Sequence, residues 1–314
     1  MKICVTATSF IKNTSLKSAL ESRFSDCSIH YIDNQDVEEF LCHHKPDGWI
    51  VGRERVDYRL LESLDSLKII SKYGVGVDNI DFNAAKRFGV KVGFTPGVNA
   101  VSVAEFTIGM IISLSRNISL GSRLLSNGIW RKNGGVNFSN STIGIVGCGH
   151  VGSKVGSLAR GFGCRVLIND IEDRSDVAVE NGFEVFELDQ LLEVADFVTL
   201  HVPLTEKTNG FIDLSRLSRI GPDGFLINTS RGEVVVQNDL KMALAEKKIA
   251  GAACDVFENE PLEDKALYQL KNFVGTPHIA GNSHQAVLAM GKAAINNLSE
   301  GLNPQRGNRN ERSN

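Results

Sequence analysis

Short apolar runs alternate with longer amphipathic segments along most of the chain. The short runs are rich in Val, Ile and Leu, and most of them are bracketed by Gly, Pro, Asn or Asp, a pattern typical of β-strands. We therefore predict strands at residues 2–7, 28–31, 48–51, 68–72, 91–93, 142–146, 165–169, 197–200, 224–228, 251–255 and 273–275.

The segments between these runs have helical periodicity. They predict helices at residues 12–23, 54–61, 83–87, 103–115, 151–162, 188–194, 238–246 and 285–298. Strands that alternate with helices and carry continuous apolar runs indicate parallel sheets covered on both faces. The predicted fold class is α/β with doubly wound parallel sheets.

A turn cluster at residues 95–99 precedes the helix predicted from Val103. Ser102 and Glu105 have the spacing of a capping box, so we expect this helix to begin there. The helix is apolar almost all round, and such a helix must be buried. We expect one face of it to pack against another subunit.

Length and composition narrow the functional classes. At roughly 100–200 residues per domain, 314 residues predict two domains. Lys and Arg total 34 against 37 Asp and Glu, so no charge excess favours nucleic acid or an anionic membrane. The apolar stretch 103–114 is too short to cross a bilayer. We expect neither a nucleic-acid nor a membrane partner.

The six cysteines form no C-x-x-C pair and show no zinc-site spacing with histidine. Reduced thiols are typical of intracellular proteins. The N-terminus has the pattern of a first strand and lacks that of a signal peptide. We therefore expect a cytoplasmic protein without a metal site.

A dinucleotide-binding fingerprint follows the predicted strand 142–146, in Gly147-Cys-Gly149-His-Val-Gly152. Gly147 permits a tight turn, Gly149 lets the backbone approach a pyrophosphate, and Gly152 lets the helix pack on the strand. The helix N-terminus then offers unpaired N–H groups to the phosphates. Within this loop, His150 and Val151 are expected to bind the cofactor as well.

Asp170 ends the second strand of this unit, 18 residues after Gly152. Its carboxylate can accept hydrogen bonds from the adenosine ribose and would repel a 2′-phosphate. NAD is therefore the predicted cofactor rather than NADP. Arg174 is close enough in sequence to temper that preference.

Three later segments place polar residues at strand ends, where open α/β sheets bind their ligands. The first starts at His201, the second runs from Asn228 to Gly232, and the third runs from Asp255 through Glu260 to the segment 276–281.

These segments, together with Lys72-Tyr-Gly-Val-Gly-Val-Asp78 and Thr95-Pro-Gly-Val-Asn99, resemble the D-isomer-specific 2-hydroxyacid dehydrogenase family. The likeness runs from about Lys72 to Gly281 and is greatest to the D-3-phosphoglycerate dehydrogenase branch. It implies a Rossmann NAD-binding domain, residues 97–282, inserted into a flavodoxin-like substrate domain of residues 1–96 and 283–314. It also implies an active site between the two domains.

The resemblance further implies a homodimer formed through the nucleotide domain. Trp130 resembles an element of that interface, although a single Trp also suits simple core packing. Because the chain ends soon after the last predicted helix, we expect no C-terminal regulatory domain.

The resemblance assigns the chemistry to three residues. His278 is implied as the acid/base, and histidine suits that role because its ordinary pKa lies near neutral. Glu260 is implied as its partner, since a carboxylate stabilises imidazolium; from the sequence alone it would pass for a surface carboxylate in an acidic loop. Arg231 is implied as the residue whose guanidinium binds the substrate carboxylate and polarises the carbonyl.

The remaining implied contacts fall into two sets. Asp255 is implied to bond the nicotinamide carboxamide. The cofactor set also contains His201, Val202, Pro203, Thr229, Ser230, Arg231, His278 and Gly281. The substrate set contains Arg53, Lys72, Tyr73, Gly74, Val75, Gly76, Asn99 and Arg231.

Lys72 and Arg53 are the cations available for a phosphorylated substrate. Together they favour the oxidation of 3-phosphoglycerate to 3-phosphohydroxypyruvate, the first step of serine biosynthesis. A glyoxylate or hydroxypyruvate reductase is the alternative. A third possibility is a scaffold that senses NAD, like the corepressors that share the Arg, Glu and His set.

Overall fold

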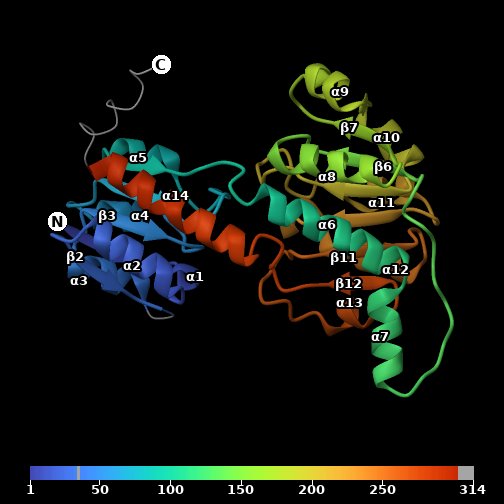
Figure 1. The fold of residues 1–314 in the computed structure, drawn as a ribbon, viewed down its shortest axis with the longest axis horizontal. Coiled ribbons are helices and arrows are strands. Elements are labelled where there is room, and N and C mark those ends of the chain that lie inside the picture. The colour runs from blue at the N-terminus through green and yellow to red at the C-terminus, as the bar shows by residue number, and fades with distance from the viewer. Residues whose placement is uncertain (34–35, 303–314) are drawn as a thin grey trace. The chain divides into compact units, whose positions relative to one another are not determined.

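The computed structural model describes residues 1–33 and 36–302. The chain divides into two compact units (Figure 1). The first contains residues 1–99 and the C-terminal part from Asn282 onward, and the second is Ala100–Gly281. Residues 97–99 and Asn282 therefore belong to the first unit, whereas the sequence placed them in the second.

The first unit is built on a five-stranded parallel sheet of order β2-β1-β3-β4-β5. This is the strand order of the flavodoxin-like fold. Lys2 pairs with Ser28, and Gly48 pairs with both Ile3 and Ile69. The strands are β1 (Lys2–Val5), β2 (Ser28–Tyr31), β3 (Gly48–Val51), β4 (Ile69–Lys72) and β5 (Lys91–Gly93).

Helices cover this sheet and enclose two apolar clusters. One cluster is centred on Trp49 and Ile70, and the other on Phe10, Ile50 and Leu298. The C-terminal helix α14 (His284–Leu302) packs on β3, β4, β5 and α2 and so closes the second cluster. The other helices are α1 (Thr8–Ile11), α2 (Thr14–Arg23), α3 (Val37–His44), α4 (Tyr58–Glu62) and α5 (Phe82–Arg87).

The second unit is built on a seven-stranded parallel sheet of order β12-β11-β10-β9-β6-β7-β8. Counted from β6, this is the dinucleotide-binding order 3-2-1-4-5-6 with one further strand. The strands are β6 (Thr142–Val146), β7 (Arg165–Asn169), β8 (Glu184–Val185), β9 (Phe197–Leu200), β10 (Phe225–Asn228), β11 (Gly251–Cys254) and β12 (Phe273–Gly275).

The helices of the second unit pack on both faces of its sheet, as the apolar clusters on either side require. They are α6 (Ala100–Ser115), α7 (Ile118–Ser126), α8 (His150–Gly161), α9 (Ser175–Asn181), α10 (Leu188–Val194), α11 (Leu214–Ile220), the 3₁₀ turn Gly232–Val234, α12 (Gln237–Ala245) and α13 (Lys265–Gln269). In Figure 1, α7 and the loop after it extend away from the body of this unit. The predicted α/β class with two doubly wound sheets is confirmed.

The prediction that α6 is capped at Ser102 is wrong. The helix begins at Ala100, so Ser102 lies inside it and the capping box does not form. The Ser102 hydroxyl instead donates to the carbonyl of Ala280, 2.7 Å away.

Of the two interpretations of Trp130, core packing is excluded, because its side chain is 79% exposed in this chain.

No single helix in the described part of the chain is long and apolar enough to cross a membrane. The pair α6 and α7 passes that test by length and composition, with a bend of 61° at its break.

Candidate active site

The glycine loop between β6 and α8 has the backbone geometry that the fingerprint requires. Gly147 has φ of +93°, and a Cβ there would lie 2.6 Å from the carbonyl oxygen of His201. A Cβ on Gly152 would lie 2.1 Å from the carbonyl oxygen of Gly147. Both positions therefore exclude any side chain, and the loop can close only with glycine.

The N-terminus of α8 is open to a ligand. Its N-cap, Gly149, provides no side-chain acceptor, and a Cβ built on Gly149 would meet no atom within 4 Å. The first N–H groups of a helix have no partner inside the helix, so these amides are available to an anion. The loop follows β6, next to β9, where the strand order reverses and dinucleotides bind. These features fit the pyrophosphate of NAD, with His150 and Val151 in the first turn of α8.

Asp170 directly follows β7 and is fixed by two backbone donors. Its Oδ2 accepts from the N–H of Cys148 at 2.8 Å, and its Oδ1 accepts from the N–H of Glu172 at 3.0 Å. The carboxylate is thus tied to the glycine loop on one side. The next residue, Ile171, is 98% exposed and was not among the predicted cofactor residues. The sequence carried no signal for it, because the exposure of a single apolar side chain is visible only in the structure.

The segment after β9 lies against the glycine loop. A Cβ on Gly147 would come within 2.9 Å of Val202 Cγ1, which places Val202 beside that loop. The carbonyl of Pro203 accepts from the hydroxyl of Thr208 at 2.6 Å, closing the following turn. His201 Nε2 is 3.0 Å from Thr199 Oγ1, and burial lowers the pKa of His201 to about 3.

This histidine makes stability pH-dependent in a defined direction. Its pKa is lower in the folded chain than in the unfolded one, so between about pH 6.5 and 3 the unfolded chain binds a proton that the folded chain does not. Stability should be unaffected by His201 above pH 6.5 and should fall as the pH decreases below it. Between pH 7 and pH 4, the free energy of unfolding measured in urea should decrease by about 1–3 kcal/mol more for the wild type than for His201→Gln.

The exposed His150 offers the matched control. His150→Gln should follow the wild type at every pH. A constant difference between His201→Gln and the wild type across this range would show that His201 is not kept neutral by folding.

The turn after β10 is organised by Asn228, which is 1% exposed. Its Oδ1 accepts from the N–H and the hydroxyl of Ser230, and its Nδ2 donates to the carbonyl of Arg231 at 2.8 Å. Thr229 is anchored to α6, since its Oγ1 lies 2.9 Å from that of Thr107. These bonds fix the backbone that presents Arg231.

The β10 and β11 loops touch at Gly232. A Cβ there would lie 1.9 Å from the backbone carbon of Phe257, so no other residue fits. Arg231 is thereby held next to the segment that leads to Glu260. The Arg231 guanidinium donates to the carbonyl of Ser230 at 2.7 Å.

His278 and Glu260 are in direct contact. Nδ1 of His278 lies 2.9 Å from Oε2 and 3.1 Å from Oε1 of Glu260. The histidine side chain is 34% exposed and that of the glutamate 15%. Glu260 is fixed in turn by the N–H of Phe257, which donates to Oε1 at 3.2 Å. The carboxylate therefore orients a partly accessible imidazole.

Asp255 holds the loop that carries His278. Its Oδ1 accepts from the Thr276 hydroxyl at 2.6 Å and from the N–H of Ile279 at 2.9 Å, and its Oδ2 accepts from the N–H of Ala280 at 2.8 Å. His278 has φ of +54°, a conformation that non-glycine residues adopt only when their surroundings impose it. The Asp255 carboxylate supplies that constraint. Gly281 ends this loop.

The residues predicted to bind substrate from the N-terminal half lie in the first unit. Lys72 is only 6% exposed, and its ammonium donates to the carbonyl of Gly52 and to Asn79 Oδ1, the latter at 2.8 Å. Arg53 is exposed on the loop after β3. Tyr73 is half-buried against Phe10, and burial raises the pKa of its hydroxyl to about 12.

The loop of Gly74, Val75 and Gly76 is partly exposed, as is Asn99, the last residue of the first segment of this unit. Gly74 has φ of +113°, which turns the chain directly after β4.

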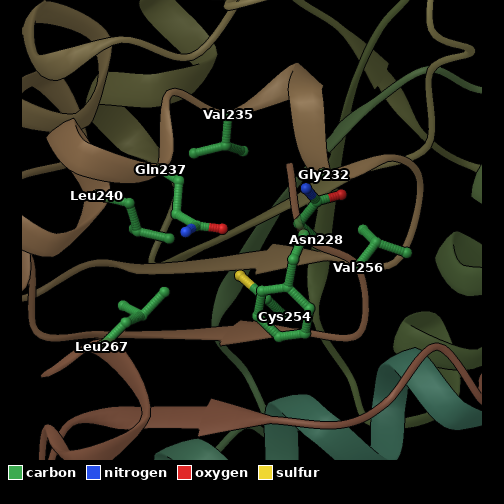
Figure 2. A pocket seen from close by; sticks show the side chains of 9 residues that line it. Asn228, Gly232, Val235, Gln237, Leu240, Cys254, Val256 and Leu267 are labelled. Carbon is green, nitrogen blue, oxygen red and sulfur yellow. The ribbon is translucent and has the colours of Figure 1, made fainter. Parts of the chain in front are cut away.

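A small cavity lies between the β10 loop and α12 (Figure 2). Its volume is about 10 Å³, which is too small for a cofactor or a 2-oxo acid. Figure 2 shows that Asn228, Gln237, Cys254 and Leu267 contribute to its lining. Among the residues that the structure describes, no three His, Cys, Asp or Glu side chains are grouped to hold a metal ion.

Known proteins share both the sequence and the fold. Residues 108–280 match the family described as D-isomer specific 2-hydroxyacid dehydrogenase, NAD binding domain. A glyoxylate reductase of Thermococcus litoralis is 37% identical over 254 residues, which cover 78% of this chain and 77% of that protein. A D-3-phosphoglycerate dehydrogenase of Methanocaldococcus jannaschii is 36% identical over 81% of this chain but only 49% of its own length.

A D-lactate dehydrogenase of Aquifex aeolicus, solved with NAD and lactic acid, superposes with a TM-score of 0.86. It is 26% identical, and the match covers 98% of this chain and 96% of that one.

The family match spans more than half of the chain, and the glycine loop, the strand-end Asp170 and the His278–Glu260 pair stand in the unit that it covers. The chain belongs to the D-isomer specific 2-hydroxyacid dehydrogenase family and is an NAD-dependent oxidoreductase of 2-hydroxy acids.

Proposed function

We propose that the enzyme reduces a small unphosphorylated 2-oxo acid, of the glyoxylate and hydroxypyruvate class, to the 2-hydroxy acid. The contact between His278 Nδ1 and the Glu260 carboxylate supports this chemistry most directly. It is the arrangement that an alcohol–ketone conversion needs, since that reaction moves a proton as well as a hydride.

Each of the three residues has a separate task. With Nδ1 bonded to Glu260, His278 Nε2 is the atom that gives a proton to the substrate oxygen in reduction and removes it in oxidation. The Glu260 carboxylate stabilises the charged imidazole. The Arg231 guanidinium binds the substrate carboxylate and polarises the reacting carbonyl.

Bound NADH supplies the hydride. The chain would hold its pyrophosphate at the N-terminus of α8 and its adenosine ribose at Asp170. The exposed Ile171 would give the adenine an apolar neighbour. The loop after β9 and the turn of Thr229 and Ser230 would border the rest of the cofactor.

The environment of Lys72 supports the unphosphorylated substrate. Its ammonium is buried and bonded to Gly52 and Asn79, and a cation in this state is poorly placed to receive a phosphate. The glyoxylate reductase of Thermococcus litoralis, similar over most of both chains, points to the same class.

Oxidation of 3-phosphoglycerate is the second candidate. The exposed Arg53 favours it, because a guanidinium can bind phosphate in bidentate fashion. The similarity to the D-3-phosphoglycerate dehydrogenase of Methanocaldococcus jannaschii supports it too.

Parallel kinetics with NADH and glyoxylate, hydroxypyruvate, 3-phosphohydroxypyruvate, pyruvate and 2-oxoglutarate separate these candidates. We expect kcat/KM to be at least about tenfold higher for glyoxylate or hydroxypyruvate than for the phosphorylated acid, a difference of about 1.4 kcal/mol in transition-state binding. Arg53→Gln should leave kcat/KM for the preferred acid within about twofold of the wild-type value. Arg55→Gln removes a neighbouring cation, which is paired with Asp57, and is the matched control.

The opposite preference, lost in Arg53→Gln but kept in Arg55→Gln, would establish the phosphoglycerate reaction instead. Absence of turnover with every acid, despite NADH binding, would point either to a 2-oxo acid outside this set or to the scaffold that senses NAD.

The proposal includes a homodimer. Helix α7 has no buried residue, and apolar side chains are exposed on it and on the loop that follows. Such a surface is typical of a protein–protein interface. Sedimentation velocity at micromolar concentration tests this pairing, and a monomer would contradict it. The exposed side chains are Ile118, Leu125, Ile129, Trp130 and Val136.

A further inference from the structure

An ion-pair network surrounds the carboxylate proposed to receive the adenosine ribose. Arg174 lies four residues after Asp170, and its Nε is 3.4 Å from Asp170 Oδ2. The terminal Nη2 is closer to Glu172, at 2.6 Å from Oε2. The guanidinium therefore stands beside Asp170 while its Nη2 is engaged by Glu172.

The two contacts differ in kind. In the described structure, Arg174 Nε is buried and has no hydrogen-bond partner, so its approach to Asp170 is a contact of charges only. Asp170 is 11% exposed and Glu172 is 67% exposed. The buried carboxylate keeps lone pairs for ribose hydroxyls, and the exposed one holds the arginine.

This arrangement bears on the choice between NAD and NADP. A 2′-phosphate would replace the hydroxyl that meets Asp170, so it would need a nearby cation to offset that carboxylate. Arg174 is in place to be that cation, but its Nη2 is already engaged by Glu172. Two carboxylates, those of Asp170 and Glu172, contact the one guanidinium, whereas the Asp173 carboxylate accepts from the N–H and the hydroxyl of Ser175.

The geometry points to Glu172 as a specificity-determining residue: by holding Arg174, it keeps the guanidinium from a 2′-phosphate and so preserves the selectivity for NAD. Asp170 binds the ribose, Arg174 is a latent phosphate ligand, and Glu172 decides whether that ligand is available. This inference rests on the proposed binding of the adenosine ribose at Asp170.

Binding measurements on the purified full-length chain test it without turnover. NADH and NADPH are titrated by nucleotide fluorescence, and AMP and adenosine 2′,5′-bisphosphate, which differ only in the 2′-phosphate, by calorimetry. In Glu172→Gln, the Kd of NADPH should fall about three- to fivefold while that of NADH stays within about twofold, as expected when a competing exposed carboxylate is removed. The bisphosphate should gain affinity in parallel, and AMP should not.

Glu184→Gln is the matched control. It removes one negative charge and releases Arg165, whose ion pair with Glu184 measures 2.6 Å. Arg165 begins β7 and Asp170 follows its end, about 17 Å away at the rise of a strand. That separation exceeds the screening length of about 8 Å at physiological salt, so this variant should leave both affinities unchanged.

Adding Arg174→Gln to Glu172→Gln should abolish the gain. An equal gain in Glu184→Gln, no gain in Glu172→Gln, or a gain that survives the loss of Arg174 would each overturn the inference. Asp170→Ala separates it from the cofactor placement on which it rests. If Asp170→Ala binds NADH with the wild-type Kd, the placement of the adenosine ribose at Asp170 is wrong. If the Kd of NADH rises at least tenfold in Asp170→Ala while Glu172→Gln has no effect on the Kd of NADPH, only the role of Glu172 is contradicted.

Discussion

Replacing His278 with glutamine should lower kcat/KM for the preferred 2-oxo acid by about 10²–10⁴, because the reaction loses its general acid and base. The loss should appear in kcat more than in KM, since binding of the substrate carboxylate is assigned to Arg231. The Kd of NADH, measured by fluorescence titration, should change little. Glutamine keeps a similar size and can still donate to Glu260, 2.9 Å from the imidazole in the wild type.

Glu260→Gln tests the partner of this histidine. The variant removes the charge that stabilises imidazolium, so kcat for reduction should fall at least about tenfold, while KM and the Kd of NADH change little. An unchanged kcat would reduce Glu260 to a packing role. More than a tenth of wild-type activity in His278→Gln would show that another group transfers the proton.

Replacing Arg231 with lysine should lower kcat/KM by about 10²–10³, although the positive charge is kept. The two parallel N–H groups of a guanidinium match a carboxylate, whereas an ammonium group binds it through single bonds. KM should rise along with the fall in kcat, which distinguishes this variant from His278→Gln. The affinity for oxamate, a carboxylate that resembles a 2-oxo acid, should fall by the same factor by which KM rises.

Arg219→Lys is the matched control, because Arg219 is a surface arginine of the same unit that pairs with Glu193 at 2.6 Å and Asp189 at 3.5 Å. It should retain the wild-type rate. The assignment of Arg231 would be contradicted if Arg231→Lys bound oxamate normally. A normal melting temperature in all three active-site variants is expected, and it would show that the losses are not those of a misfolded chain.

The strands were the most predictable part of the fold. Buried parallel strands require continuous apolar runs between turn residues, and such runs are visible without knowledge of neighbours. The runs at 28–31, 48–51, 142–146, 165–169 and 197–200 match strands of the structure residue for residue. The two-residue strand β8 was missed, since Glu184 and Val185 pair only because β7 lies beside them.

Helices with weak apolar patterns were missed for a related reason. Helix α3 buries only Leu41, and α9 buries only Ala178, so neither leaves a clear periodic stripe in the sequence. The burial of one side chain against the sheet and the local caps suffice to form them. The predicted start of α6 was wrong for a different reason. Ser102 and Glu105 have the spacing of a capping box, but the helix continues past Ser102 and begins at Ala100.

The sequence by itself determined the local chemistry of this protein. The glycine loop, the strand-end Asp170 and the interleaving of strands and helices all follow from short-range constraints of backbone geometry and apolar pattern, and such constraints are carried by neighbouring residues. The resemblance of several motifs in one order also led to the family.

Only the tertiary structure decided which polar side chains bond to one another. It placed the buried Lys72 on Gly52 and Asn79, tied the Asp255 carboxylate to the loop of His278, and engaged Arg174 with Glu172. Each of these partners depends on how loops meet in space. The sequence does not show whether a charged side chain faces water, a ligand or a backbone amide. Its partner depends on which residues the fold places around it and on how deeply it is buried.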